Sequence, residues 1–126
     1  MPQEGKKIIL IADDSKDILL VLQIRLETAG YKVLTAGDGK AAWETLQKTK
    51  PDLAILDIQM PYLNGWEVCR KIRQDRGLGS LPVIILTAKS QNQDELMSYE
   101  CGADRYISKP FDDADLLKAI KELEGA

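Results

Sequence analysis

The sequence predicts an α/β fold in which helices cover both faces of a five-stranded parallel sheet. Five short runs rich in Ile, Val and Leu alternate with five longer amphipathic segments along the 126 residues. Apolar runs this short are typical of parallel strands buried on both faces. Their alternation with helices indicates right-handed crossover units. Strands are expected at about 7–12, 31–36, 52–57, 83–87 and 104–108, and helices at about 16–29, 39–48, 65–75, 91–101 and 113–123.

The first helix is predicted from the spacing of its apolar residues. Leu19, Leu22, Leu26 and Ala29 recur at intervals of three and four, with polar residues between them. This spacing places them on one side of a helix and predicts an amphipathic stripe that faces the core. Gly30 then fits the position just after the helix, where a left-handed backbone is common.

The later helices are predicted in the same way. Asn64 can cap the third helix, and the last helix repeats the apolar stripe with Leu116, Ile120 and Leu123. The fourth helix, at 91–101, has a polar first half and the least apolar anchoring of the five. We therefore expect it to be the helix that shifts most easily.

Length, charge and cysteine content limit the class of protein. The chain is long enough for one domain, expected to span 1–126, and too short for two. A net charge of −3 without a long basic run argues against nucleic-acid binding by this domain. Cys69 and Cys101 are expected to be ordinary helix residues rather than a disulfide. The polar start at 1–5 and the short first apolar run predict neither a signal peptide nor a membrane span, so a cytoplasmic location is expected.

Polar side chains stand where four of the predicted strands end. Parallel strands bring their carboxyl ends to one edge of the sheet, and in the predicted strand order 2-1-3-4-5 ligands bind there between strands 1 and 3. This edge should therefore collect three carboxylates, a hydroxyl and an amine. The residues are Asp13 and Asp14 after the first strand, Asp57 after the third, Thr87 after the fourth and Lys109 after the fifth.

The three carboxylates predict a cation site. At a separation of about 5 Å each ionised pair repels by about 3 kcal/mol at an effective dielectric of 20, so protons or a cation must relieve the charge. Oxygen ligands without His or Cys nearby suit a hard cation such as Mg²⁺. The alternative is that adjacent acidic residues only cap the next helix. That alternative accounts for Asp13 and Asp14 alone better than for a cluster that includes Asp57.

A carboxylate beside Mg²⁺ also suggests phosphoryl transfer, with the carboxylate as nucleophile. Lys109 can reach one phosphoryl oxygen as a flexible point charge, and the Thr87 hydroxyl with a nearby backbone N–H can serve another. Taken singly, Lys109 is more typical of a solvated lysine and Thr87 of an ordinary strand residue. The chain has no histidine, which excludes a Ser/His/Asp triad and requires any phosphohistidine donor to be another protein.

Five motifs together resemble the receiver domain of two-component response regulators, of the chemotaxis-receiver type. The resemblance covers essentially the whole chain, in the right order and spacing. It implies a flavodoxin-like fold with two helices on one face of the sheet and three on the other. The motifs are ADDS at 12–15, LDIQMP at 56–61, NG at 64–65, LTAKS at 86–90 and GADRYISKPF at 102–111.

The resemblance implies a phosphoacceptor and a set of metal ligands. Asp57 would accept the phosphoryl group from a phosphohistidine on a histidine kinase or phosphotransfer protein. Asp14 would bind Mg²⁺ directly and Asp13 largely through water, with Asp57 and the backbone carbonyl of Gln59 as further ligands. Mn²⁺ can substitute for Mg²⁺ at such a site. Phosphorylation would be self-catalysed, and the domain would not be a turnover enzyme.

The resemblance also implies a switch. Thr87, the Ala88 backbone N–H and Lys109 would bind the phosphoryl group, Tyr106 would turn inward on activation, and the bond before Pro110 would be cis. The side chains of Gln59 and Lys89 would tune the phosphoryl lifetime, and Lys89 is expected to slow attack by water. The face at 91–123 would then change its partner binding, either as a monomer or in a phosphorylation-dependent dimer.

Three other functions compete with this one. A Mg²⁺-dependent phosphatase of the haloacid dehalogenase type also uses Asp, Thr and Lys, but it carries its nucleophile in a D-x-D pattern after the first strand, which ADDSKD lacks. A flavodoxin-like FMN binder would place phosphate against Asp13 and Asp14, which repel it. A receiver-like domain could also act by docking alone. The downstream element is either a separate target protein or a fused output domain.

Overall fold

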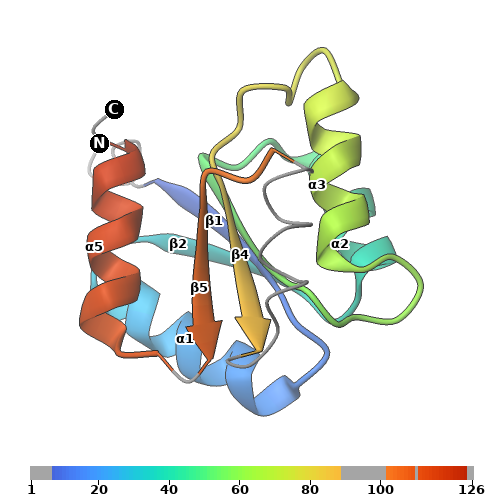
Figure 1. Ribbon diagram of the computed structural model, residues 1–126. Coiled ribbons are helices and arrows are strands. Elements are labelled where there is room, and N and C mark those ends of the chain that lie inside the picture. Colours follow the sequence, from blue (N-terminus) through green and yellow to red (C-terminus); the bar gives the residue numbers. More distant parts are fainter. Residues whose placement is uncertain (1–6, 89–101, 110, 125–126) are drawn as a thin grey trace.

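The computed structural model describes residues 7–88, 102–109 and 111–124, and these residues form five strands and four helices. None of the helices in these residues is long and apolar enough to cross a membrane. Figure 1 shows the elements in chain order: β1 Ile8–Ala12, α1 Lys16–Thr28, β2 Lys32–Ala36, α2 Gly39–Lys48, β3 Leu53–Asp57, α3 Gly65–Gln74, β4 Val83–Ala88, β5 Arg105–Lys109 and α5 Asp113–Glu124.

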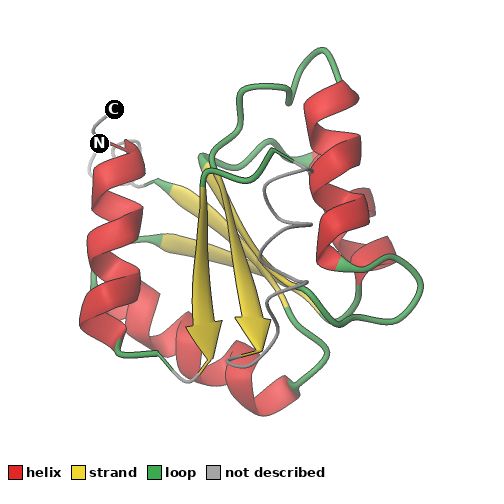
Figure 2. Ribbon diagram, viewed as in Figure 1, coloured by secondary structure: helices red, strands yellow, loops and turns green. Residues whose placement is uncertain are grey.

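The predicted sheet is confirmed. Its five strands lie in the order β2-β1-β3-β4-β5, and all four strand pairs are parallel. Every described element begins and ends within one residue of its predicted bounds. The helices α1 and α5 cover one face of the sheet and α2 and α3 cover the other (Figures 1 and 2). The predicted helix at 91–101 lies outside the described residues.

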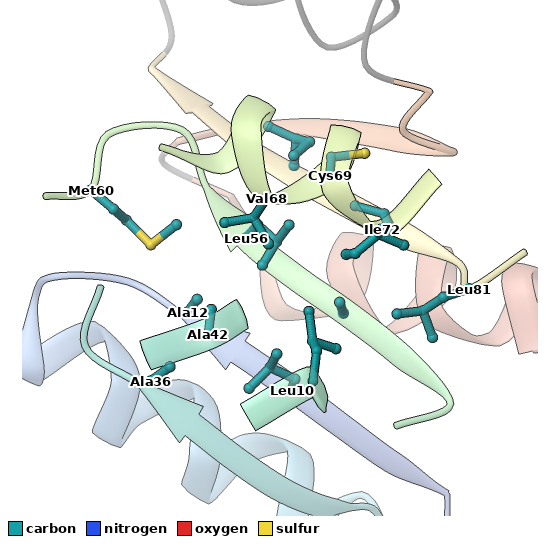
Figure 3. Close-up of a cluster of buried hydrophobic side chains, with 14 of the residues drawn as sticks. Leu10, Ala12, Ala36, Ala42, Leu56, Met60, Val68, Cys69, Ile72 and Leu81 are labelled. Atoms are coloured by element: carbon teal, nitrogen blue, oxygen red, sulfur yellow. The ribbon is translucent and has the colours of Figure 1, made fainter. Parts of the chain in front are cut away.

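Two hydrophobic clusters hold the layers together, because successive strand residues point to opposite faces. Ile9, Ile11 and Ile55 face α1 and α5, where they meet Leu26 and Ile120. The alternate strand residues face α2 and α3, and Figure 3 shows this second cluster. Its members include Leu10, Ala12, Leu56, Ala42, Val68, Cys69 and Ile72. The central strands are therefore buried on both faces, as their continuous apolar runs predicted.

Side chains fix the first turns of the three helices that follow β1, β2 and β3. Ser15 Oγ accepts the Ile18 N–H at 3.3 Å at the start of α1, and Asp38 Oδ1 accepts the Ala41 N–H at 2.7 Å at the start of α2. Asn64, predicted as the cap of α3, forms a reciprocal capping box with Glu67. These caps satisfy N–H groups that helix geometry leaves without partners.

The predicted stripe on the first helix is only partly correct. Leu22 and Leu26 are buried, but Ala29 is exposed because it is the residue at which α1 ends. The left-handed backbone predicted for Gly30 is confirmed by its φ of +101°. The outer side of α1 is not uniformly polar, because it also carries three exposed apolar side chains, Leu20, Val21 and Ile24.

Arg73 ties the end of α3 to the amino ends of β4 and β5. Its guanidinium donates to the carbonyl of Leu81 at 2.7 Å and to that of Gly102 at 2.8 Å. It also pairs with Asp104 at 2.9 Å, and the same Asp104 oxygen accepts the Val83 N–H at 2.8 Å. One cation therefore satisfies acceptors on both the α3–β4 loop and the segment before β5.

We predict that Arg73→Ala lowers the free energy of unfolding by about 2 kcal/mol, because hydrogen bonds to a charged group contribute about 1.5–3 kcal/mol each and their acceptors would lose a partner. Urea unfolding followed by circular dichroism measures this. Arg70→Ala is the matched control, because Arg70 lies on the same helix and is exposed. Equal losses in the two variants would contradict the assigned role of Arg73.

Candidate functional site

The carboxyl ends of four strands meet at one edge of the sheet, as predicted from the sequence. The register places Asp57 of β3 opposite Leu86 of β4 and pairs Ala88 with Lys109 of β5. The arrowheads of β4 and β5 point to this edge in Figure 1, and α1 begins there. The loop between β1 and α1 adds the two adjacent aspartates.

Asp13, Asp14 and Asp57 form a carboxylate cluster. Each offers an oxygen that lies within 4.8 Å of the others, close to the separation of about 5 Å assumed in the estimate of their repulsion. Asp13 and Asp57 are buried, with exposed fractions of 1% and 6%, whereas Asp14 is exposed. Two of these charges are therefore poorly solvated and close together, and Asp14 completes the set from the solvent side.

Lys109 bridges the two buried carboxylates. Its Nζ lies 3.1 Å from Asp13 Oδ2 and 3.0 Å from Asp57 Oδ1. Since its own side chain is 27% exposed, the ammonium is also partly withdrawn from water. The alternative in which Lys109 is a solvated surface lysine is therefore wrong.

The charges of this cluster shift one another's titration. Burial is the main cause that raises the pKa of the Asp57 carboxyl above its ordinary value, although the hydrogen bond from Lys109 opposes it and the charge of Asp13 adds to it. Burial acts to lower the pKa of Lys109, but its hydrogen bond with Asp57 and the charges of Asp57 and Asp13 outweigh burial, so this pKa is raised. The charged form of Lys109 is therefore stabilised, whereas the ionised form of Asp57 is destabilised by its burial.

Ser15, rather than either aspartate, caps α1. Its hydroxyl accepts the Ile18 N–H, and its own N–H donates to Asp13 Oδ1 at 2.9 Å. Both oxygens of Asp13 thus have a partner, one in Ser15 and one in Lys109. The interpretation that the acidic residues only cap a helix does not account for Asp14, Asp57 or the position of Lys109.

Two cavities open beside the cluster. One, of about 220 Å³, is lined by all three aspartates together with Ser15, Ile18, Ile58, Gln59 and Lys109. The other, of about 420 Å³, shares Asp14, Ile58 and Gln59 with the first and extends along the β3–α3 loop. Both cavities therefore leave open space beside the carboxylates, which a Mg²⁺ ion that keeps several waters requires.

The residues that line the first cavity fit a hard cation. Its ligand atoms within the described residues are oxygens, and neither histidine nor cysteine contributes to the carboxylate cluster. The exposed position of Gln59 at the mouth of both cavities is compatible with its predicted role. Metal binding by the Gln59 backbone carbonyl stays a prediction. Direct binding by Asp14 and water-mediated binding by Asp13 stay predictions as well.

Thr87 lies one residue before the end of β4 and is 1% exposed. Its hydroxyl is buried and has no hydrogen-bond partner within the residues that the structure describes. Tyr106 on β5 is partly buried and packs against the cluster beneath α2 and α3. A buried hydroxyl without a hydrogen-bond partner lowers stability. The Thr87 hydroxyl could therefore donate a hydrogen bond to a new acceptor at this edge of the sheet.

Some predicted residues lie outside the described part of the chain, and some lining residues were not predicted. Lys89, Cys101 and Pro110 belong to the first group, together with the helix at 91–101. Ser15 as helix cap, Ile18 and Trp66 belong to the second, whereas Asn64 was predicted as a helix cap but not as a residue that lines a cavity. The sequence carried a signal for Ser15, because it precedes the first helical run, but none that placed Trp66 at a cavity.

Comparison with known proteins agrees with the geometry. The family model for the response regulator receiver domain matches residues 9–121. The chain is 40% identical over 117 residues to the alkaline phosphatase synthesis transcriptional regulatory protein PhoP of Bacillus subtilis, covering 93% of this chain and 48% of that protein. The chain spans about half the length of the curated relatives it matches.

Solved structures give the same result. The signal receiver domain of a signal transduction histidine kinase from Syntrophus aciditrophicus matches with a TM-score of 0.88 and 38% identity, over 93% of this chain and 89% of that one. The receiver domain of a sensor histidine kinase from Pseudomonas aeruginosa, described with magnesium coordinated in its active site cleft, matches with a TM-score of 0.90 and 27% identity, over 97% and 100%. Nothing in these matches supports the haloacid dehalogenase alternative. The chain belongs to the response regulator receiver domains, the signalling domains of two-component systems.

Proposed function

We propose that this chain is a phosphoacceptor switch in which Asp57 takes a phosphoryl group from a phosphohistidine on a histidine kinase or phosphotransfer protein. One observation carries the proposal. The Asp57 carboxylate is buried at the end of β3, lies within 4.8 Å of two further carboxylates and is bonded to Lys109 at 3.0 Å. Burial and the neighbouring charges raise the free energy of the ionised carboxylate, and a cation bound beside it would lower that free energy.

The transfer exchanges one bond for another. The N–P bond of the phosphohistidine breaks, an O–P bond to an Asp57 carboxylate oxygen forms, and the imidazole leaves with its electron pair. Reactions of this kind depend mainly on positioning and on neutralising the phosphoryl oxygens. Lys109 is already next to Asp57 and can bind one phosphoryl oxygen. The Thr87 hydroxyl, which has no partner among the described residues, and the Ala88 backbone N–H can donate to another.

Mg²⁺, or Mn²⁺ in its place, would be held by the carboxylate cluster and would neutralise charge on the phosphoryl oxygens. Asp14 is exposed at the cavity and suits direct binding. Both oxygens of Asp13 already have partners, which favours a water-mediated role. The Asp57 carboxylate and the Gln59 backbone carbonyl complete the proposed ligand set. The described magnesium ion in a related receiver domain supports this assignment.

The proposed output is a conformational change rather than turnover of a substrate. A phosphoryl group adds about one further negative charge and strong acceptors at Asp57. Thr87 would move toward it, Tyr106 would follow, and the face at 91–123 would change its affinity for partners. Gln59 and Lys89 would set how long the phosphoryl group persists. These movements involve segments outside the described residues and are part of the proposal.

The partners of the whole protein belong to the same proposal. Several relatives that the chain matches over about half their length are named as transcriptional regulators. A fused output domain or a separate target protein would therefore bind the changed face at 91–123. The domain would act either as a monomer or as a dimer formed through the same face. A cytoplasmic location fits a kinase as donor and stays a prediction.

We predict that the chain acquires one phosphoryl group from phosphoramidate in the presence of Mg²⁺, because this compound carries the same kind of N–P bond as phosphohistidine. Intact mass spectrometry measures the product. Asp57→Asn should abolish labelling and chelation of the metal should do the same, while Asp17→Asn, an exposed control on α1, should label normally. Labelling of Asp57→Asn, or steady hydrolysis of a phosphate ester, would contradict the proposal.

We predict that Thr87→Val keeps or slightly raises stability, by up to about 1 kcal/mol, because it removes a buried hydroxyl that has no partner among the described residues. The same change should weaken the response to beryllofluoride, which mimics the phosphoryl group on Asp57. Thermal unfolding with and without beryllofluoride and Mg²⁺ measures both effects. Thr35→Val, exposed on β2, is the control. An unchanged beryllofluoride response in Thr87→Val would rule out its role in sensing phosphate.

A further inference from the structure

The β3–α3 loop contains a strained turn next to the carboxylate cluster. The N–H of Leu63 donates to the carbonyl of Pro61 at 2.8 Å, which closes a three-residue turn around Tyr62. Tyr62 has a φ of +70° and is the one residue other than glycine with a positive φ in the described part of the chain. Its side chain is 78% exposed, so packing of that side chain does not hold the turn in place. Something else must stabilise this conformation.

The turn lies directly against the first residue of α2. A Cβ atom on Gly39 would lie 1.7 Å from the carbonyl oxygen of Leu63 and 2.5 Å from its carbonyl carbon. The Gly39 N–H also points to the Pro61 carbonyl, at 3.4 Å. Gly39 is therefore the residue that permits the β3–α3 loop and the amino end of α2 to approach this closely.

The other end of the same loop is fixed by a second close approach. A Cβ atom on Gly65 would lie 2.5 Å from the carbonyl oxygen of Asp57, and the Gly65 N–H donates to the carbonyl of Ile58 at 3.1 Å. The segment 59–63 thus lies between two close backbone contacts, one made by Gly65 and the other made by Gly39. It begins at Gln59, which lies at the mouth of both cavities.

We propose that Gly39 is a positioning residue for the metal site: it holds the β3–α3 loop in the conformation that presents the Gln59 backbone to a cation bound by the three aspartates. This rests on the proposed function, because it takes the Gln59 carbonyl as a metal ligand. Gly39 itself touches neither metal nor phosphate. It acts through Leu63 and Pro61, which the turn couples into one unit.

A side chain at position 39 would displace the loop more readily than the helix. α2 is anchored through Ala42 and Leu46, which are 0% and 3% exposed in the core beneath it, so moving it would open space in a close-packed interior. The loop carries exposed residues at Pro61 and Tyr62 and would lose strain by leaving its turn. The Leu63 carbonyl would have to retreat by more than an ångström to escape the contact. We expect the loop to carry part of this displacement to Gln59, where Mg²⁺ tolerates little departure from near-ideal octahedral geometry.

The test is Mg²⁺ affinity measured by isothermal titration calorimetry on the folded protein. Gly39→Ala should weaken Mg²⁺ binding by about tenfold, which is the size of effect seen when a supporting contact of a metal ligand is lost. Gly37→Ala is the matched control, because a Cβ there would meet nothing within 4 Å, and it should bind as the wild type does. A purely structural role of Gly39 would lower the unfolding temperature and leave the affinity of the folded protein unchanged.

A second variant covers the case in which Gly39→Ala does not fold. Gly39→Ala combined with Tyr62→Gly gives the turn a residue that accepts many backbone conformations, so the loop can move while the fold is kept. This double variant should bind Mg²⁺ as weakly as Gly39→Ala, and Tyr62→Gly alone should bind normally. Wild-type affinity in a folded Gly39→Ala or in the double variant overturns the role of Gly39 alone. Absence of Mg²⁺ binding by the wild type overturns the proposed function with it.

Discussion

The contact of Lys109 with Asp13 and Asp57 is the interaction on which the site depends. Two buried carboxylates with a third beside them would repel by about 3 kcal/mol for each pair at an effective dielectric of 20, and the structure places one ammonium 3.1 and 3.0 Å from the buried two. Three negative charges against one positive charge leave the cluster short of cations. A cluster with this excess of negative charge could hold a metal ion.

The fold supplies this charge arrangement because parallel strands end together. β1, β3, β4 and β5 deliver their terminal residues to one edge, and the strands themselves are anchored by two apolar clusters. The Ser15 hydroxyl caps α1 and the Ser15 N–H donates to Asp13. These polar groups already have hydrogen-bond partners, so they do not offset the remaining negative charge. The Thr87 hydroxyl is the exception at the end of β4: within the described residues, it and the Trp66 indole Nε1 are the buried side-chain polar atoms without a hydrogen-bond partner. A phosphoryl group on Asp57 would give both Lys109 and Thr87 a stronger acceptor.

The strand positions and the polar residues at the strand ends were predictable, because short apolar runs and residue type determine them. The apolar runs located every described strand to within a residue, and polar residues at their ends identified Asp13, Asp14, Asp57, Thr87 and Lys109. Contacts between distant segments were not predictable. The contact of Gly39 with Leu63 depends on how α2 packs against a loop 24 positions later in the sequence. No local sequence pattern predicts that packing. The exposed Leu20, Val21 and Ile24 of α1 likewise contradict a simple amphipathic pattern.

Urea unfolding of wild type and Asp57→Asn from about pH 3.5 to 8, without divalent metal, tests the central claim that burial destabilises the ionised Asp57 carboxylate. Burial raises the pKa of Asp57 in the folded protein above its ordinary value of 3.8, so the folded wild type binds the proton more tightly than the unfolded chain. Its stability should therefore fall as the pH rises through the folded pKa. Asp57→Asn lacks this loss, so its stability relative to the wild type should rise with pH. An advantage that shrinks with rising pH, or a less stable Asp57→Asn at pH 8, would show that Lys109 more than compensates the charge and would contradict the account.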